Sequence, residues 1–242
     1  MLYRIVNENA EVLISSLGGT VTSFKVGNED IFYPWQMVGD KPRGGCPICA
    51  PWFGQSVRGP HDKHGHLRNL EALGHNYIGN SLTLSFNRLG DIDYPWSMEY
   101  ETTVSVAGSG IMSIRLRIKR MRDGINHLAP ILPGFHPYFV CNDASKVKVE
   151  MAGETYSGFS SEARMILIKD TKINILMPGR KVEMSLLDNF EESSHLVFWT
   201  DAPEKYFCVE PILEDKRMFD TPAGQHLEQG QSLDLVVAFK AS

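Results

Sequence analysis

In the stretch Ile111-Met-Ser-Ile-Arg-Leu-Arg-Ile-Lys-Arg-Met-Arg122, apolar and polar residues alternate. The apolar positions are Met112, Ile114, Leu116 and Ile118, and the polar positions are Ser113, Arg115, Arg117 and Lys119. Successive side chains of a β-strand point to opposite faces of the sheet, so a period of two is typical of a half-buried strand. The stretch therefore predicts a strand with one core face and one cationic, solvent-exposed face.

Short alternating or β-branched runs recur along the chain, and Gly- and Asn-containing turn signals separate them. The predicted strands are Leu2–Val6, Val12–Ser16, Val21–Val26, Ile31–Tyr33, Leu82–Asn87, Thr102–Val106, Met112–Lys119, Val147–Met151, Met165–Ile168, Ile173–Leu176, Val182–Leu186, Leu196–Thr200, Tyr206–Val209 and Leu233–Phe239. Many short strands without intervening helices favour an all-β fold, a large antiparallel sandwich or barrel. With no repeat or linker to divide it, the chain is expected to form one domain over residues 1–242.

Composition narrows the class of protein. The 242 residues are 43% hydrophobic and 22% charged, which is typical of a globular protein. The net charge of −5 gives no support to nucleic-acid binding, and no apolar run is long enough for a membrane helix. Four cysteines in a chain of this length favour reduced thiols and a cytoplasmic location over a disulfide framework.

The segment from Pro42 to Leu70 is rich in Gly, Pro, His and Arg, and is predicted to be an ordered loop packed over one sheet. Its Cys46-Pro-Ile-Cys49 pair suggests a metal or redox motif, for which His61, His64 and His66 could supply partners, but packing as small apolar groups is favoured because no second cysteine pair follows. The cluster His61, His64 and His66 has three interpretations: metal ligands, exposed loop residues, or hydrogen-bonding groups for a polar ligand.

Two other short motifs carry titratable groups. His136 stands in Pro133-Gly-Phe-His-Pro-Tyr-Phe139, and Glu210 ends the apolar run Tyr206-Phe-Cys-Val-Glu210. Each residue taken alone is more often structural than catalytic. A buried carboxyl group at a strand end would, however, have a raised pKa and could act as a general base. Glycine-rich phosphate loops and a serine-hydrolase elbow are not found in the sequence.

The order of five motifs resembles the aldose 1-epimerase (galactose mutarotase-like) superfamily. These motifs are Gly18-Gly19, Arg43-Gly-Gly-Cys-Pro followed by Pro51-Trp-Phe-Gly54, His64-Gly-His-Leu-Arg68-Asn69, His136-Pro-Tyr-Phe139 and Val209-Glu210-Pro211. The first loop motifs look most like the hexose-6-phosphate mutarotase branch, and the last two look equally like the free-aldose branch. The resemblance covers about residues 12–239 and implies a large antiparallel β-sandwich.

The resemblance also implies the chemistry, which is interconversion of the α and β anomers of an aldose or aldose phosphate without metal or cofactor. Glu210 is similar to the general base and His136 to the general acid of the family. His64 and Arg68 match sugar-binding residues, and Asp170 falls near the position of a sugar-binding aspartate. Arg43 matches the arginine that helps to hold a 6-phosphate in the phosphate branch.

Alternatives remain at this stage. The chain departs from the family at Lys63, His66, Leu67 and Pro137, which leaves open a non-catalytic carbohydrate-binding or regulatory protein of the same fold. A metal-dependent sandwich using His61, His64 and His66 is a further interpretation. Arg43, Lys63 and Arg68 together indicate an anionic ligand, unless Arg68 pairs with Asp62 or Glu71 and Arg43 anchors its own loop.

Overall fold

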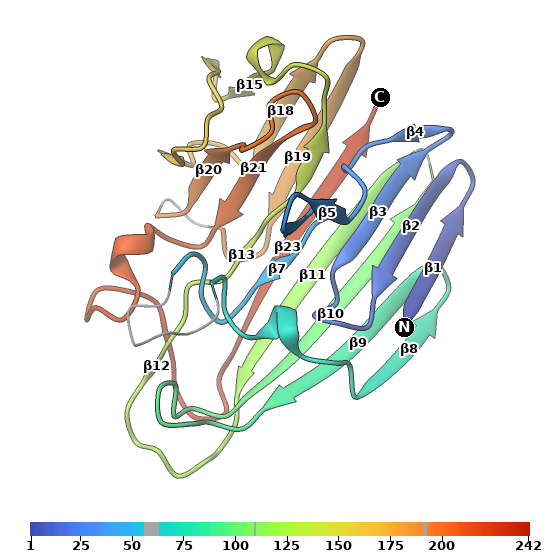
Figure 1. Cartoon of the computed structure of the whole chain (residues 1–242). Coiled ribbons are helices and arrows are strands. Elements are labelled where there is room, and N and C mark those ends of the chain that lie inside the picture. Colours follow the sequence, from blue (N-terminus) through green and yellow to red (C-terminus); the bar gives the residue numbers. More distant parts are fainter. Residues whose placement is uncertain (56–62, 109, 191–192) are drawn as a thin grey trace.

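The computed structural model describes residues 1–55, 63–108, 110–190 and 193–242. In this part of the chain the largest sheet has nine strands, and all its pairings are antiparallel. In spatial order they are β16 (Glu154–Tyr156), β15 (Lys148–Met151), β18 (Lys172–Met177), β19 (Arg180–Leu187), β23 (Ser232–Ala241), β11 (Ile111–Arg120), β10 (Met98–Ala107), β9 (Ser81–Arg88) and β8 (Gly74–Ile78). This sheet forms one layer of the molecule (Figure 1).

Two smaller antiparallel sheets make up the opposite layer. The first contains β1 (Leu2–Asn7), β2 (Ala10–Ser15), β3 (Val21–Val26) and β4 (Glu29–Asp30), and lies over β8–β11 (Figure 1). The second contains β17 (Arg164–Leu167), β20 (His195–Trp199), β21 (Tyr206–Ile212), β13 (Gly134–Phe135) and β7 (Ile48–Cys49), with β14 (Tyr138–Val140) also paired to β21. The all-β antiparallel sandwich predicted from the sequence is therefore confirmed.

Short elements complete the described chain. Two-stranded pairs are formed by β5 (Gln36–Val38) with β6 (Lys41–Arg43) and by β12 (Ala129–Pro130) with β22 (His226–Leu227). The 3-10 helices are η1 (Leu67–Asn69), η2 (Ala144–Lys146) and η3 (Lys216–Met218). Among the described residues, none of these helices has the length and apolar character to cross a membrane.

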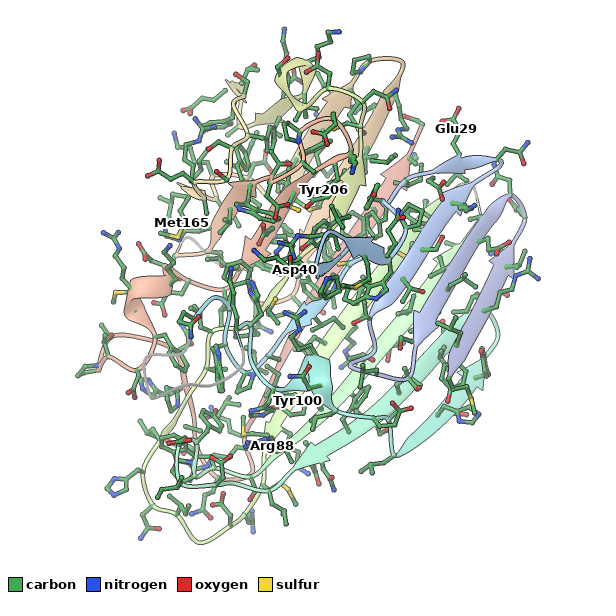
Figure 2. The ribbon with its side chains drawn as sticks, viewed as in Figure 1. Glu29, Asp40, Arg88, Tyr100, Met165 and Tyr206 are labelled. Carbon is green, nitrogen blue, oxygen red and sulfur yellow. The ribbon has the colours of Figure 1, made fainter. Side chains whose placement is uncertain are left out.

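The core lies between the layers. The ring of Phe32 makes edge-to-face contacts with rings from both layers, namely Phe24 of β3, Phe139 of β14 and Phe239 of β23, at 5.1–5.5 Å between centroids. On β11 the alternation predicted from the sequence is confirmed, because Met112, Ile114, Leu116 and Ile118 are all at most 1% exposed. Figure 2 shows the side chains of the described residues on the ribbon of Figure 1.

One predicted strand was wrong. In the segment Ile31–Tyr33, Phe32 makes only an isolated bridge to Phe139 and no regular strand is formed. The chain turns into the interior at this point. The hydrophobic residues of this segment therefore reflect the burial of Phe32 and not strand pairing. The exposed strand β8 was missed because its five residues are all solvent-exposed and its sequence lacks an alternating pattern.

Replacement of Ile114 by Val tests the buried face of β11. We expect Ile114→Val to lower the free energy of unfolding by about 0.5–1.5 kcal/mol, because it removes one methylene from a fully packed site. Ile92→Val is the matched control, since Ile92 is 96% exposed, and it should change stability by less than about 0.5 kcal/mol. Free energies of unfolding are measured by urea denaturation. An equal loss in Ile114→Val and Ile92→Val would contradict the assignment of Ile114 to the core.

Candidate active site

A pocket of about 560 Å³ opens over the sheet that contains β20 and β21. A volume of this order suits a small organic ligand. Its lining combines aromatic, cationic and titratable side chains, including Trp35, Arg43, Phe53, Lys63, His64, Arg68, His136, Tyr138, Trp199, Glu210 and Lys216. The structure thus brings five of the six predicted site residues to one cavity: Arg43, His64, Arg68, His136 and Glu210.

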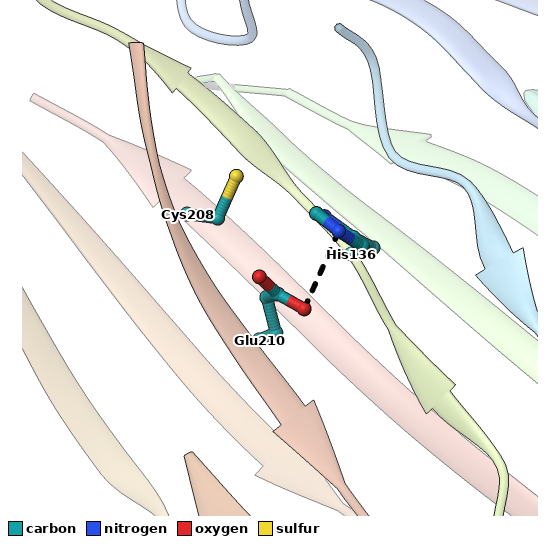
Figure 3. Close-up of side chains that lie close together, drawn as sticks. All are labelled: His136, Cys208 and Glu210. Atoms are coloured by element: carbon teal, nitrogen blue, oxygen red, sulfur yellow. Dashed lines mark ion pairs between the residues drawn. The ribbon is translucent and has the colours of Figure 1, made fainter. Parts of the chain in front are cut away.

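Glu210 and His136 form the centre of the pocket. Glu210 lies on β21, opposite Val197 of β20, and is 2% exposed. His136 follows β13 directly, and its backbone N–H donates to the Pro47 carbonyl at 3.0 Å. The His136 Nε2 atom lies 3.5 Å from Glu210 Oε2 (Figure 3). An imidazole and a carboxyl group thus lie together on the pocket wall.

Burial acts on both members of this pair. It raises the pKa of Glu210 well above its usual value, and nearby Lys63 opposes this rise. Burial lowers the pKa of His136 well below its usual value, and His64, Arg68, Lys63 and Arg43 lower it further. Both charged forms are disfavoured by desolvation, while their proximity favours the ion pair. One proton shared between the two groups can therefore move between them with little change in net charge.

His64 is held next to this pair in a neutral form. Its Nδ1 accepts a hydrogen bond from the Gly54 amide at 3.1 Å, so Nε2 carries the proton. Burial, followed by the charges of Lys63, Arg68 and Arg43, lowers the pKa of His64 to about 3. The imidazole lies 5.2 Å from that of His136, centroid to centroid. It can donate a hydrogen bond to a polar ligand without adding a charge.

Two glycine residues allow the segments that carry His64 and Arg43 to pack against neighbouring backbone. Gly65 has φ of 74°, and a Cβ there would lie 2.2 Å from the Ala50 carbonyl oxygen. Gly45 has φ of 62°, and its Cβ would lie 2.1 Å from the Val21 carbonyl oxygen. Only glycine fits both the backbone angle and the space at these positions. The Gly residues of the two loop motifs therefore set the positions of His64 and Arg43.

Arg43 is engaged by the protein itself. Its Nε and Nη2 donate to the carboxylate of Asp201, with an Nη2–Oδ2 distance of 2.6 Å, and Nη1 donates to the Pro42 carbonyl. The guanidinium also lies 5.3 Å from the centroid of the Trp199 ring. The Tyr206 hydroxyl donates to the same Asp201. Arg43 therefore lines the pocket with its charge largely neutralised, as expected for an anchoring role.

The other cations of the pocket come from different segments. Arg68 belongs to η1 and its Nη1 donates to the Lys63 carbonyl at 3.4 Å, while Lys216 belongs to η3. Glu71, one of the two acids considered as a partner for Arg68, lies 3.9 Å from the amino group of Met1. The other, Asp62, lies outside the described residues. Arg68, Lys63 and Lys216 give this pocket a positive potential that favours an anionic ligand.

The structure does not bring Asp170 to the pocket. Its side chain is exposed and accepts a hydrogen bond from the Lys172 amide at 3.0 Å, in the turn that leads into β18. The pocket is lined by Ser161, Ala163 and Met165, before and within β17, whereas Asp170 follows β17 at its far end. The match made by sequence position is therefore corrected, and we assign no ligand contact to Asp170.

Two members of the histidine cluster, His64 and His66, lie in different environments. His66 Nε2 lies 2.6 Å from the Tyr100 hydroxyl in the buried core, whereas His64 faces the pocket; Figure 2 shows Tyr100 beside η1. His61 lies outside the described residues. The proposed metal set of His61, His64 and His66 is thus not supported, because His64 and His66 serve different environments. Cys46 and Cys49 are buried with free thiols, and burial raises the pKa of both, so they pack as apolar groups.

Cys208 lies unexpectedly close to the central pair. Its Sγ, a His136 ring nitrogen and a Glu210 oxygen lie within 4.8 Å of one another in the described part of the chain (Figure 3). Three such atoms could in principle hold a soft metal ion. Burial raises the pKa of the Cys208 thiol, and Arg43, Lys63 and Arg68 line the same pocket. The His136 and Glu210 atoms of this group are close enough to exchange a proton.

Several residues that line the pocket or contact its lining are not indicated by the sequence motifs. Asp201 anchors Arg43, Trp199 borders His136, and Lys216 adds a cation. Trp199 could have been found from the register alone, because β20 alternation places Val197 and Trp199 on the face that carries Glu210. The contact between Arg43 and Asp201 spans 158 residues, so no local pattern indicates it.

The antiparallel strand architecture is that of a galactose mutarotase-like β-sandwich. The family model described as aldose 1-epimerase matches residues 1–167. The chain therefore belongs to the aldose 1-epimerase family, and the family and fold support mutarotase activity in general. No curated protein sequence matches the chain significantly.

Solved structures show the same fold over the whole chain. A galactose mutarotase related enzyme from Lactobacillus acidophilus is similar with a TM-score of 0.78 and 13% identity, covering 100% of this chain and 97% of that one. A galactose mutarotase-like protein from Lactobacillus casei has a TM-score of 0.75 and 13% identity, with 100% of both chains covered. Galactose 1-epimerase from Lactobacillus acidophilus has a TM-score of 0.72 and 9% identity, covering 99% and 93%.

Proposed function

We propose that this protein is a mutarotase that interconverts the α and β anomers of an aldose phosphate by acid–base ring opening. The observation that carries the proposal is the Glu210–His136 pair in the pocket, with 3.5 Å between Oε2 and Nε2. In a pyranose, the C1 hydroxyl and the ring oxygen are bonded to the same carbon. The base and acid that act on them must therefore lie close together, as these two groups do.

The reaction starts from the form in which Glu210 is ionised and His136 carries the proton. Glu210 removes the proton from the C1 hydroxyl, the bond between C1 and the ring oxygen breaks, and His136 protonates that oxygen. The product is the open-chain aldehyde, with a free hydroxyl on the former ring oxygen. Glu210 is now protonated and His136 is neutral, the forms that burial favours.

Ring closure reverses these roles. Rotation about the C1–C2 bond presents the other face of the aldehyde to the hydroxyl. His136 then accepts the hydroxyl proton as the oxygen attacks C1, and Glu210 returns its proton to the carbonyl oxygen. The other anomer is formed, and both residues regain their starting state. No electrons are exchanged with a redox partner, and the pair supplies both proton transfers.

The pocket residues supply contacts for the rest of the sugar. His64 Nε2–H is a neutral donor for a sugar hydroxyl, and we assign Arg68, a charged donor in the same pocket, to the phosphate group of the substrate. The positive potential from Lys63, Arg68 and Lys216, in a protein of net charge −5, supports a phosphorylated aldose as substrate. Arg43 is assigned to the wall of the pocket, because Asp201 already occupies its guanidinium.

We also propose that residues 1–242 form one domain. The main hydrophobic cluster includes residues from Ile5 to Ala241, so both ends of the chain contribute to a single core. The four buried free thiols support residence in a reducing compartment, such as the cytoplasm.

Removal of metal ions should leave activity unchanged, because the Glu210–His136 pair supplies both proton transfers. We expect protein dialysed against a chelator to exchange anomers at the rate of the untreated protein. Two-dimensional NMR magnetisation exchange between the α and β C1 protons measures this rate. Loss of activity on chelation, restored by one divalent ion, would contradict the mechanism. Binding of the sugar without any exchange would instead support a non-catalytic carbohydrate-binding protein.

A further inference from the structure

Among the described residues, none forms a hydrogen bond with the second ring nitrogen of His136. Its Nε2 faces Glu210, whereas Nδ1 is buried and has no hydrogen-bond partner among the described residues. Catalytic histidines commonly have their ring fixed by a carbonyl or carboxylate on the nitrogen that does not react. Packing must therefore set the orientation of the His136 ring.

Tyr138 provides the closest ring contact. The Tyr138 and His136 rings are stacked, with centroids 4.7 Å apart and an angle of 6° between their planes. Trp199 meets the imidazole at 5.9 Å and 86°, so it contacts the ring at a right angle. A parallel ring on one side and a perpendicular ring on another restrict rotation of the imidazole about its side-chain bonds.

Tyr138 is itself held firmly. Its backbone N–H donates to the Gly45 carbonyl at 2.9 Å, and in the β14–β21 pairing it lies opposite Cys208. Its ring contacts those of Tyr206 at 5.0 Å and Trp199 at 6.3 Å, and Tyr138 is 5% exposed. The stacked ring is thus a fixed part of the sheet and not a mobile side chain.

The stack also affects the charge of His136. The face of a phenol ring is electron-rich and attracts a cation that lies over it. Burial and the positive charges of Lys63, Arg68 and Arg43 disfavour the imidazolium form of His136. The carboxylate of Glu210 favours it. The titratable and charged groups that face His136 from the elements around it are Glu210 and Cys208 of β21, Tyr138 of β14, His64, Lys63 and Arg68 of the segment before and within η1, Arg43 of β6, and Cys46 before β7.

We propose that Tyr138 is the positioning residue for His136, and that its ring face both orients the imidazole and stabilises the imidazolium from which the ring oxygen is protonated. The role rests on the proposed mutarotase function, but the contact itself can be tested without turnover. The ring is what acts, so the hydroxyl group of Tyr138 should be dispensable. The aromatic residue two positions after His136 in the sequence, Tyr138, thus has a functional role in the proposed site.

The test compares Tyr138→Phe, which keeps the ring, with Tyr138→Leu, which removes it. We expect Tyr138→Leu to lower kcat roughly tenfold, given the usual strength of aromatic and cation–π contacts. Tyr138→Phe should stay within about threefold of the parent, since only the ring face is needed. Tyr33→Leu is the matched control, because Tyr33 contacts Tyr206 at 5.1 Å in the same cluster.

A second readout does not depend on activity. In protein labelled with ¹³C at histidine, the NMR titration of the His136 imidazole, assigned by its loss in His136→Asn, should move to lower pH in Tyr138→Leu. It should be retained in Tyr138→Phe and Tyr33→Leu. If Tyr138→Leu does not fold, as judged by circular dichroism, Tyr138→Met removes the ring while keeping a flexible apolar side chain.

Two results would overturn the proposal. One is an unchanged His136 titration in the folded variant that lacks the ring. The other is a loss in Tyr138→Phe as large as that in Tyr138→Leu, which would assign the role to the hydroxyl group. A shifted titration in a protein that shows no anomer exchange would keep the contact but refute the proposed function.

Discussion

Glu210→Gln and His136→Asn should each lower the rate of anomer exchange by about 10² or more, the usual contribution of a positioned acid or base. Gln is nearly isosteric with Glu, and Asn keeps a planar polar group near the position of the imidazole, so the strand pairing of β21 and the backbone of the loop after β13 should persist. Glutamine cannot accept the C1 hydroxyl proton, and asparagine cannot protonate the ring oxygen. The rates are measured by magnetisation-exchange NMR at saturating sugar.

Matched controls come from the same region. Glu214 is also a buried carboxyl group, 7% exposed, but it accepts a hydrogen bond from the Gln225 amide and does not line the pocket. His195 of β20 bonds to the Ser193 carbonyl outside the pocket. Glu214→Gln and His195→Asn should retain near-parental rates. If Glu210→Gln and His136→Asn also retain them, the assignment of acid and base is wrong.

Arg68→Gln should distinguish phosphorylated from free sugars. We expect it to lower kcat/KM for a hexose 6-phosphate by roughly 10- to 150-fold, which corresponds to about 1.5–3 kcal/mol for a charged hydrogen bond. The loss on the free hexose should be far smaller, because the phosphate contact is then absent. The parent protein should also have the higher kcat/KM for the phosphorylated hexose.

Two variants control this comparison. Arg43→Gln releases Asp201 and should reduce activity on both sugars alike, since we assign Arg43 to the pocket wall. Arg217→Gln removes an equal charge near Lys216, but Arg217 pairs with Asp215 outside the pocket, so both activities should persist. An equal loss on both sugars in Arg68→Gln would show a structural role for Arg68. Preference of the parent for free hexose would contradict phosphate binding.

Much of the fold could be predicted from the sequence. The alternation in β11 is dictated by the sheet itself, because one face of the strand packs against the core and the other faces water. The same logic fails for β8, whose five residues are all solvent-exposed although the strand pairs with β9, and for Ile31–Tyr33, where burial occurs without regular pairing. The pattern of hydrophobic residues indicates which side chains are buried. It indicates a strand only where the buried residues also pair with a neighbouring strand.

The site could be predicted where a short motif carries the chemistry. Short motifs make His136 and Glu210 candidates, and the fold brings the two side chains together across 74 residues of sequence, a separation given by 210 − 136. Residues that act through tertiary contact were not found. Asp201 lies beside Arg43 only because β20 and β6 meet at the pocket, and Asp170 was placed by sequence position alone. The positions of such residues depend on contacts between distant segments, which a local sequence pattern does not show.

The most direct test of the account is magnetisation-exchange NMR of the parent protein with α- and β-anomers of a hexose 6-phosphate and of the free hexose. Exchange between the two C1 proton resonances should exceed the uncatalysed rate, rise in proportion to protein concentration, and be faster for the phosphorylated sugar. Exchange at the uncatalysed rate with all aldoses and aldose phosphates tried, in folded protein, would contradict it.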